Sequence, residues 1–294
     1  MDQPAKPPPR GVKFLKLLLK IAVMAACLWY VSGKIDVAKT KEVLGRSDWF
    51  LLLVALLVFV LSKLISAVRL NIYFRNIGIS LSEGQNIRLY LIGMFYNLFL
   101  PGSVSGDAYK VIVLTKRYAL SYKKTTAAVL LDRFSGLLGL GLLLAACSFF
   151  LLAPPYSLLL TAAALAALGG FYFSVLRWFR DFIPGFGSTL LLGLLVQAVQ
   201  LVCIYFIMLS LGVKENQLAC LFIFLVSSVV SVLPLTIGGL GIREVVFLEG
   251  AAYFGLSGET AVIISLLFYL ITLVVSATGA WYIFKDPLKQ ERTR

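Results

Sequence analysis

Two apolar stretches of this sequence are each interrupted by a proline and a group of small residues. The first interruption reads LPGSVSGD at residues 100–107 within the stretch 86–109, and the second reads LPLTIGGLG at residues 233–241 within 217–256. Proline lacks a backbone N–H and glycine is a poor helix former, so neither stretch reads as one continuous helix. Each predicts two short helices joined by a turn, which is a helical hairpin.

The 294 residues as a whole have the composition of an integral membrane protein. Hydrophobic residues make up 60% and charged residues 14% of the chain, whereas a soluble domain carries about 25% charged residues. The apolar residues form long runs such as 49–61 and 127–153, which are typical of helices that cross a bilayer. The short alternating segments of outer-membrane barrels are missing. We therefore expect an all-α polytopic membrane protein.

Several kinds of catalytic site are excluded by the residues that the sequence lacks. Histidine is missing, which rules out Ser-His-Asp and Cys-His sites and histidine-ligated metals within this chain. The four cysteines lie in apolar runs without paired spacing, so we interpret them as small core residues. No pair of nucleophile and base can be read from the remaining residues. We expect no cofactor, no metal and no enzymatic activity.

The net charge of +13 indicates the orientation of the chain in its membrane. Basic residues gather in cytoplasmic loops by the positive-inside rule, so we expect no nucleic-acid partner. We expect a disordered basic tail at 1–12, a basic connection at 110–124 and a basic tail at 285–294, all cytoplasmic. The connection after the second span is assigned to the same side on the strength of Lys63, Arg69, Arg75 and Arg88. The predicted location is the cytoplasmic (inner) membrane, with both termini in the cytoplasm.

Hydropathy predicts six spanning helices and two re-entrant hairpins, which would be counted as about eight transmembrane segments. The first span ends at Val31, and the others cover residues 49–70, 125–152, 157–176, 188–211 and 260–284. The ~12 residues that lead into the first break rise only ~18 Å as a helix, which is half a bilayer. Charge placement makes the hairpin 86–109 enter from the cytoplasmic side and the hairpin 217–256 from the external side.

The order of these segments repeats with its direction reversed. Residues 13–152 and residues 157–284 each contain two spans, one hairpin and a third span. Inverted-topology repeats of this kind are the architecture of many secondary transporters, and paired broken helices point to their binding sites. We therefore divide the chain into two membrane repeats with these bounds.

Charged and small residues near the two breaks are candidates for a polar site inside the membrane. Half-helices that begin after Gly106 and Gly241 would point free N–H groups at the midplane, where such groups attract phosphate or carboxylate. Arginine suits bidentate phosphate binding, but the intramembrane carboxylates outnumber the bases, so a cationic head group stays open, as does proton transport by a carboxylate. Mutual pairing, for example of Arg133 with Asp107, is the structural alternative. The predicted substrate-binding residues are Asn97, Pro101, Gly102, Gly106, Asp107, Lys110, Asp132, Arg133, Pro234, Gly238, Gly239, Gly241, Arg243 and Glu244.

Three ordered motifs surround these residues: NLFLPG at 97–102 with Gly106-Asp107, DRFSGL at 132–137, and Leu233-Pro234 with GGLGIRE at 238–244. They resemble the signatures of the lysylphosphatidylglycerol synthase transmembrane-domain family, which are flippase-like integral membrane proteins, and the resemblance covers nearly the whole chain. Ser105 stands where a second glycine is usual and Lys110 where arginine is usual. The resemblance implies movement of aminoacylated phospholipids between leaflets, or of other lipids in stand-alone relatives. We expect a stand-alone member without the synthase domain.

The sequence and the resemblance together predict a lipid flippase that moves a phospholipid or a polyprenyl-phosphate-linked lipid. The bases expected to meet phosphate are Lys110, Arg133 and Arg243. The carboxylates expected to orient them or to couple protons are Asp107, Asp132 and Glu244. The expected partners are membrane lipids, with a lipid aminoacyltransferase or glycosyltransferase as a candidate protein partner. A secondary transporter of a small soluble anion and a non-transporting scaffold for a lipid-modifying enzyme stay open as alternatives.

Overall fold

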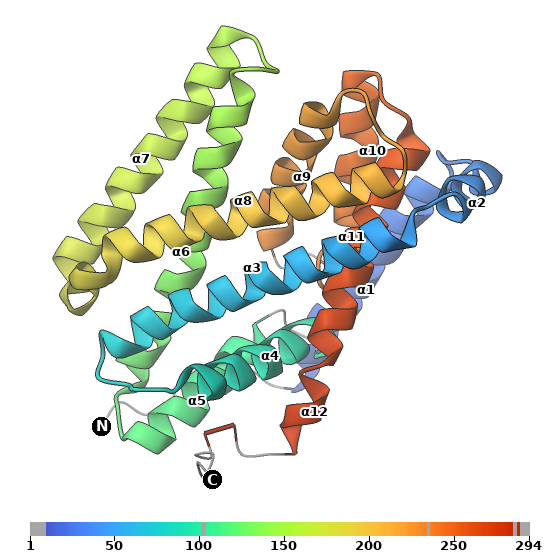
Figure 1. Ribbon diagram of the computed structural model, residues 1–294. Coiled ribbons are helices and arrows are strands. Elements are labelled where there is room, and N and C mark those ends of the chain that lie inside the picture. The colour runs from blue at the N-terminus through green and yellow to red at the C-terminus, as the bar shows by residue number, and fades with distance from the viewer. Residues whose placement is uncertain (1–9, 101–103, 234–235, 285–286, 289–294) are drawn as a thin grey trace.

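The computed structural model describes residues 10–100, 104–233, 236–284 and 287–288 of the chain. Every regular element within these residues is a helix (Figure 1). The helices of the first half are α1 (Arg10–Ser32), α2 (Val37–Gly45), α3 (Trp49–Arg75), α4 (Glu83–Phe99), α5 (Ser105–Tyr118) and α6 (Tyr122–Ser148).

The second half repeats this order of helices. It consists of α7 (Pro154–Trp178), the 3-10 helix η1 (Arg180–Gly185), α8 (Phe186–Ser210), α9 (Gln217–Val232), α10 (Ile242–Phe254), α11 (Gly258–Ala277) and α12 (Ala280–Ile283). In each half a long helix, a short one and a second long helix are followed by two helices of 13 to 17 residues and by a last long helix.

Five helices in the described part of the chain are long and apolar enough to cross a membrane. They are Trp49–Arg75, Tyr122–Ser148, Pro154–Trp178, Arg180–Ser210 and Gly258–Ile283. Each overlaps one of the spans predicted from hydropathy. The first predicted span corresponds to α1, whose apolar part Leu18–Ser32 is shorter than the other five. The chain is thus a polytopic helical membrane protein.

Short polar residues fix where several helices begin. The Asp48 carboxylate accepts the N–H of Phe50 at the start of α3 at 2.9 Å. Ser82 and Gln85 form a reciprocal capping box at the start of α4. Such caps satisfy N–H groups that have no partner within the helix. They separate helices from connections within a sequence that is apolar almost throughout.

The two long helices α3 and α8, one from each half, pack along each other through the middle of the molecule (Figure 1). The helix α6 packs across α8, and glycines at the crossing point let the two backbones approach. A methyl group added to Gly139 of α6 would lie 2.7 Å from the carbonyl carbon of Gly193 in α8. Small residues at such crossings allow close packing of helices in membranes.

The helices on either side of each predicted break form a hairpin. In Figure 1 the α4–α5 hairpin rises from the lower end of the molecule, whereas the α9–α10 hairpin descends from the upper end. The backbones of α4 and α5 touch where Gly106 lies against the carbonyl group of Gly93. The turned ends of the two hairpins meet, because a methyl group on Gly238 would lie 2.3 Å from a Leu98 side-chain carbon. The sequence places the breaks at corresponding positions, and the fold brings them together.

The crossing of α6 and α8 can be tested with two glycines on one helix. In Gly139→Ala the new methyl group would collide with the backbone of α8, so we expect a loss of about 1–3 kcal/mol, the usual range for overpacking. In Gly141→Ala the new methyl group meets no atom within 4 Å, and alanine favours a helix. Thermal unfolding in detergent should therefore give a lower melting temperature for Gly139→Ala only. Equal melting temperatures for the two variants would contradict the close crossing.

Candidate functional site

The first hairpin holds a network of one carboxylate, one buried base and one exposed base. Asp107, at the start of α5, forms an ion pair with Arg133 of α6 and accepts from Lys110 Nζ at 3.3 Å. The side chains of Asp107 and Lys110 are 13% and 8% exposed, and that of Arg133 is 39% exposed. The Arg133–Asp107 pair named above as the structural alternative is therefore present, and it ties the hairpin to α6.

Asn97 braces the first break. Its side-chain oxygen accepts the N–H of Gly106 at 2.8 Å across the turn. Gly106 belongs to the first turn of α5, where N–H groups lack partners within the helix. The geometry thus gives Asn97, one of the predicted substrate-binding residues, the role of a brace.

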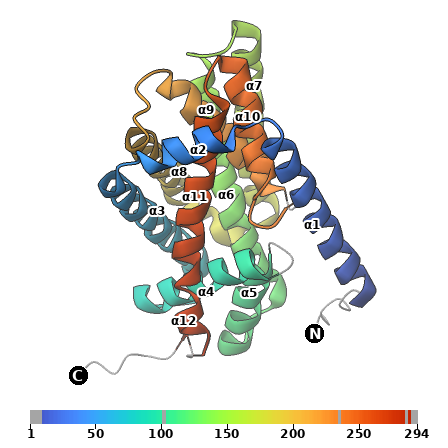
Figure 2. The same ribbon diagram turned by 90° about the vertical axis from the view of Figure 1, so that its right-hand side faces the viewer.

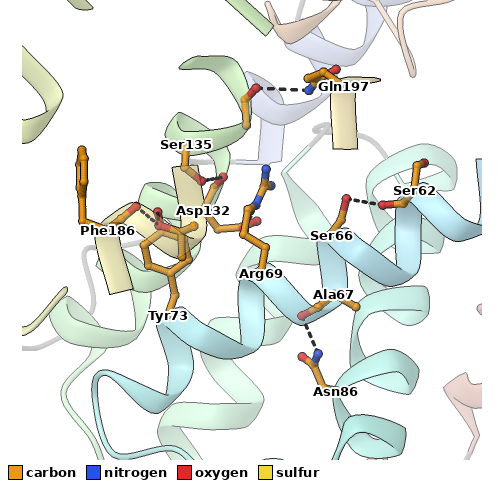
Figure 3. Close-up of polar contacts among 12 residues, drawn as sticks. Ser62, Ser66, Ala67, Arg69, Tyr73, Asn86, Asp132, Ser135, Phe186 and Gln197 are labelled. Atoms are coloured by element: carbon orange, nitrogen blue, oxygen red, sulfur yellow. Dashed lines mark hydrogen bonds and ion pairs between the residues drawn. The ribbon is translucent and has the colours of Figure 1, made fainter. Parts of the chain in front are cut away.

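A second buried ion pair joins α3 to α6. Arg69 Nε lies 2.8 Å from an Asp132 carboxylate oxygen, and the two side chains are 7% and 11% exposed. Figure 3 shows the Arg69 guanidinium pointing from α3 towards the space between Ser135 and Gln197. Its Nη1 atom is buried and has no hydrogen-bond partner among the residues that the structure describes. Asp132 thus pairs with Arg69 of α3 and not with its neighbour Arg133.

Arg69 belongs to a polar stripe that sequence reasoning missed. The stripe runs along one face of α3 and consists of Ser62, Ser66, Arg69 and Tyr73. Positions spaced by four, three and four residues share one face of a helix. This spacing of polar residues within an apolar span is the sequence signal from which the stripe could have been predicted. The prediction that Lys63 and Arg69 belong to a cytoplasmic connection is wrong, because both residues lie in α3, which continues to Arg75.

The second hairpin holds a buried carboxylate that binds neutral groups. Glu244 of α10 is 1% exposed. One of its oxygens accepts the N–H of Gly241 at 2.5 Å and the other accepts the hydroxyl of Ser265 in α11 at 2.7 Å. Gly241 has a φ of +88°, and Gly238 and Gly239 also have positive φ, a region that glycine enters freely. Glu244 therefore braces the second break as Asn97 braces the first.

Arg243 lies against aromatic rings instead of a carboxylate. Its Cζ atom is 4.9 Å from the ring centre of Phe268 and 5.7 Å from that of Phe224. Ring faces attract a cation but accept no conventional hydrogen bond from its N–H groups. The Nη1 atom of Arg243 is buried without a hydrogen-bond partner in the described part of the chain. At least one N–H group of this guanidinium therefore has no acceptor among the described residues.

Lys63 of α3 completes this arrangement from the other half of the chain. Its Nζ lies 4.4 Å from the ring centre of Phe59, and it is close enough to Arg69 and Arg243 to interact electrostatically with both. We call the following residues the central charge cluster: Lys63, Arg69, Asp107, Lys110, Asp132, Arg133, Arg243 and Glu244. It contains five bases and three carboxylates.

The structure separates the remaining predicted site residues into several groups. Asn97, Gly106, Asp107, Lys110 and Arg133 gather at the first hairpin, whereas Gly241 and Glu244 gather at the second. Pro101, Gly102 and Pro234 lie outside the described residues. Glu249 lies within the stretch 217–256 and adds a fourth carboxylate by sequence, but it is exposed and accepts from the Tyr30 hydroxyl at 2.6 Å. With Glu249 outside the cluster and two bases added, the expected excess of carboxylates becomes an excess of bases.

The cluster can bind an anion electrostatically. Each charge near a bilayer centre costs ~2.5–3.5 kcal/mol on insertion scales, so an excess of bases favours an anionic ligand. The described residues contain no group of three or more histidine, cysteine, aspartate or glutamate side chains that could hold a metal ion.

Broken helices and buried charges on a polytopic helical scaffold define a class of membrane protein with an internal polar site. The comparisons give the family. The model of the lysylphosphatidylglycerol synthase TM region matches residues 17–186 and 183–279, and the chain belongs to this family. It is similar to a UPF0104 membrane protein of Pyrococcus horikoshii, at 25% identity over 86% of this chain and 90% of the relative. A UPF0104 membrane protein of Archaeoglobus fulgidus is 29% identical over 34% of this chain and 30% of that protein.

The buried Arg69–Asp132 pair makes a prediction about stability. Asp132→Ala would leave the Arg69 charge uncompensated, which costs about 3–5 kcal/mol. We expect a large fall of the melting temperature, and substantial recovery in the double variant Arg69→Met/Asp132→Leu because the charge is then removed. The exposed pair Arg46–Glu42, 2.7 Å apart, is the control, and Glu42→Gln should cost below about 1 kcal/mol. If Asp132→Ala and Glu42→Gln melted alike, Arg69 would not depend on Asp132.

Proposed function

We propose that this protein moves a lipid with a phosphate-containing head group between the leaflets of the cytoplasmic membrane. The lipid is a phospholipid or a polyprenyl-phosphate-linked lipid, and its head group passes through the central charge cluster while its chains stay in the bilayer. Membership of the lysylphosphatidylglycerol synthase TM region family supports a lipid substrate. No chemical change of the lipid is part of the proposal, which makes the protein a transporter and not an enzyme.

The observation that carries the proposal is the contact between the turned ends of two hairpins beside an arginine with an unpartnered buried N–H group. Leu98 of the first hairpin touches Gly238 of the second, and Arg243 follows five residues after Gly238. Helix breaks at membrane depth are tolerated where they are buried in protein or line a water-filled cavity. A pair of them from two halves of a chain is the arrangement that transporters use at their binding sites.

We propose a topology with six spans and two re-entrant hairpins. The two halves, 13–152 and 157–284, then form an inverted repeat, and α4–α5 enters from the cytoplasmic side and α9–α10 from the external side. The opposite directions of the two hairpins in Figure 1 support this topology. Basic residues in the helix ends that flank the connections 76–82 and 119–121, among them Arg75, Arg117 and Lys123, support a cytoplasmic lower end and cytoplasmic termini.

A carrier for a small soluble anion is the second candidate, because the same bases would bind its charge. A non-transporting scaffold for a lipid aminoacyltransferase or glycosyltransferase is the third. The scaffold needs the charges only for folding, so folded variants that lack them would keep its function. Transport measurements on charge variants separate the three candidates.

Leaflet exchange of labelled lipids in proteoliposomes tests the proposal. We expect wild-type protein to exchange labelled phosphatidylglycerol or polyprenyl phosphate, and Arg243→Ala to slow the exchange about tenfold or more. The loss of one hydrogen bond to a charged group accounts for a factor of this size. Arg243→Lys should be intermediate, because it keeps the charge and loses the bidentate geometry.

Arg177→Ala is the matched control, because Arg177 is exposed near the end of α7 and lies outside the cluster. Its exchange rate should equal that of the wild type. Exchange of neither lipid by folded wild-type protein would contradict the proposal. Uptake of a soluble anion under the same conditions would favour the carrier.

A further inference from the structure

Lys63 and Arg243, which come from different halves of the chain, are supported by one group of aromatic rings. The Phe59 and Phe268 rings meet edge to face with their centres 5.4 Å apart, and Phe268 meets Phe224 in the same way at 4.8 Å. Lys63 lies on Phe59 at one end of this group, and Arg243 lies on Phe268 and Phe224 at the other. Three packed rings therefore hold two cations near each other.

Neither cation has its charge balanced by a direct ion pair among the described residues. Lys63 forms no ion pair with a carboxylate in that part of the chain, and neither does Arg243. The carboxylate next to Arg243 in sequence, Glu244, is occupied by Gly241 and Ser265. Arg69 is paired through Nε, and its buried Nη1, like the Nη1 of Arg243, has no hydrogen-bond acceptor among the described residues. Buried N–H donors without acceptors cost free energy unless a ligand supplies the acceptor.

The charge of the missing ligand follows from the balance of the central charge cluster. Three carboxylates offset three of the five bases, which leaves two positive charges. Two of the carboxylates, Asp107 and Asp132, lie in ion pairs with Lys110, Arg133 and Arg69. One of the two positive charges therefore lies with Lys110 and Arg133, which share Asp107. The other lies with Lys63 and Arg243, which form no direct ion pair among the described residues.

We propose that Lys63 and Arg243 bind a phosphate monoester, with Arg69 contributing charge beside them. This inference rests on the proposed transport of a phosphate-containing lipid and names its head-group class. A monoester carries −1.5 to −2 charges near neutral pH, which matches the net charge of +2 on the central charge cluster. A phosphodiester such as phosphatidylglycerol carries one negative charge. An aminoacylated head group such as lysylphosphatidylglycerol is net positive and would be repelled.

Binding measurements on the purified full-length chain in detergent test the head-group class without any transport. The probes are phosphatidic acid as the monoester, phosphatidylglycerol as the diester and lysylphosphatidylglycerol as the cationic lipid. We expect phosphatidic acid to bind roughly tenfold or more tightly than phosphatidylglycerol, since one additional charge-assisted contact is made. Lysylphosphatidylglycerol should bind most weakly. If it bound as tightly as phosphatidic acid, the inference would be overturned without any variant.

Variants of the lysine test the assigned residue. Lys63→Gln should lower the preference for phosphatidic acid over phosphatidylglycerol roughly tenfold, and Lys63→Arg should keep most of it. Lys116→Gln, which removes an exposed lysine of α5, should leave the preference unchanged. A folded Lys63→Gln protein with the wild-type preference would overturn the role of Lys63. If Lys63→Gln does not fold, the inference is still tested by the preference of Lys63→Arg for phosphatidic acid and by the order in which the wild type binds the three lipids.

Two further experiments, a competition with a soluble monoester and a comparison of binding with leaflet exchange, separate this inference from the proposed function. Glycerol 3-phosphate has the same head group as phosphatidic acid but no acyl chains. If it displaced phosphatidic acid at equal concentration, the ligand of this site would be a soluble phosphate monoester and not a lipid. That result would overturn the lipid part of the inference. Monoester binding without leaflet exchange in vesicles would overturn the proposed transport and leave the head-group class intact. Exchange that favours lysylphosphatidylglycerol would overturn the head-group class and leave transport intact.

Discussion

The hydrogen-bonding requirement of the backbone at the two helix breaks is the constraint on which the rest of the structure depends. Hydrocarbon offers no partner to a free N–H group, so each break needs a polar side chain of the protein itself. Asn97 supplies an acceptor to Gly106 at the first break, and Glu244 supplies one to Gly241 at the second. These side chains must be held inside the molecule. Glu244 of α10 is enclosed by α11 and α1, which lie on either side of α10 in Figure 2 and contact it.

Much of this architecture can be predicted from the sequence, because it depends on local signals. Proline and glycine ended the predicted helices at both breaks, and apolar length identified the five long spans. The pairing of Arg133 with Asp107 also followed from the scarcity of charges near the first break. By contrast, Lys63 and Arg69 were assigned to a connection, because basic residues near the end of an apolar run look like positive-inside charges. The burial of Arg69 depends on the facing helix α6, which supplies Asp132, and no local pattern reveals this contact.

The two halves compensate their arginines by different means. Arg69 has a carboxylate at 2.8 Å, so the pair is neutral and is costly to break. Arg243 has aromatic faces, which stabilise a cation by about 0.5–2 kcal/mol and leave its charge in place. An ion pair closes a site to an incoming anion, whereas an aromatic support leaves the outer side of the guanidinium available. The helical order is the same in both halves, but the second half keeps its arginine free of a carboxylate.

In the proposed transport the ligand lies between the halves and not within either one. In the first hairpin Lys110 and Arg133 share Asp107, so both bases have a carboxylate partner. In the second hairpin Arg243 has no direct ion pair among the described residues, and neither has Lys63 of the first half. A ligand that satisfies both must contact α3 and α10 at once. Binding then joins the two repeats through a shared anion, and any movement of one repeat against the other has to break or re-form these contacts.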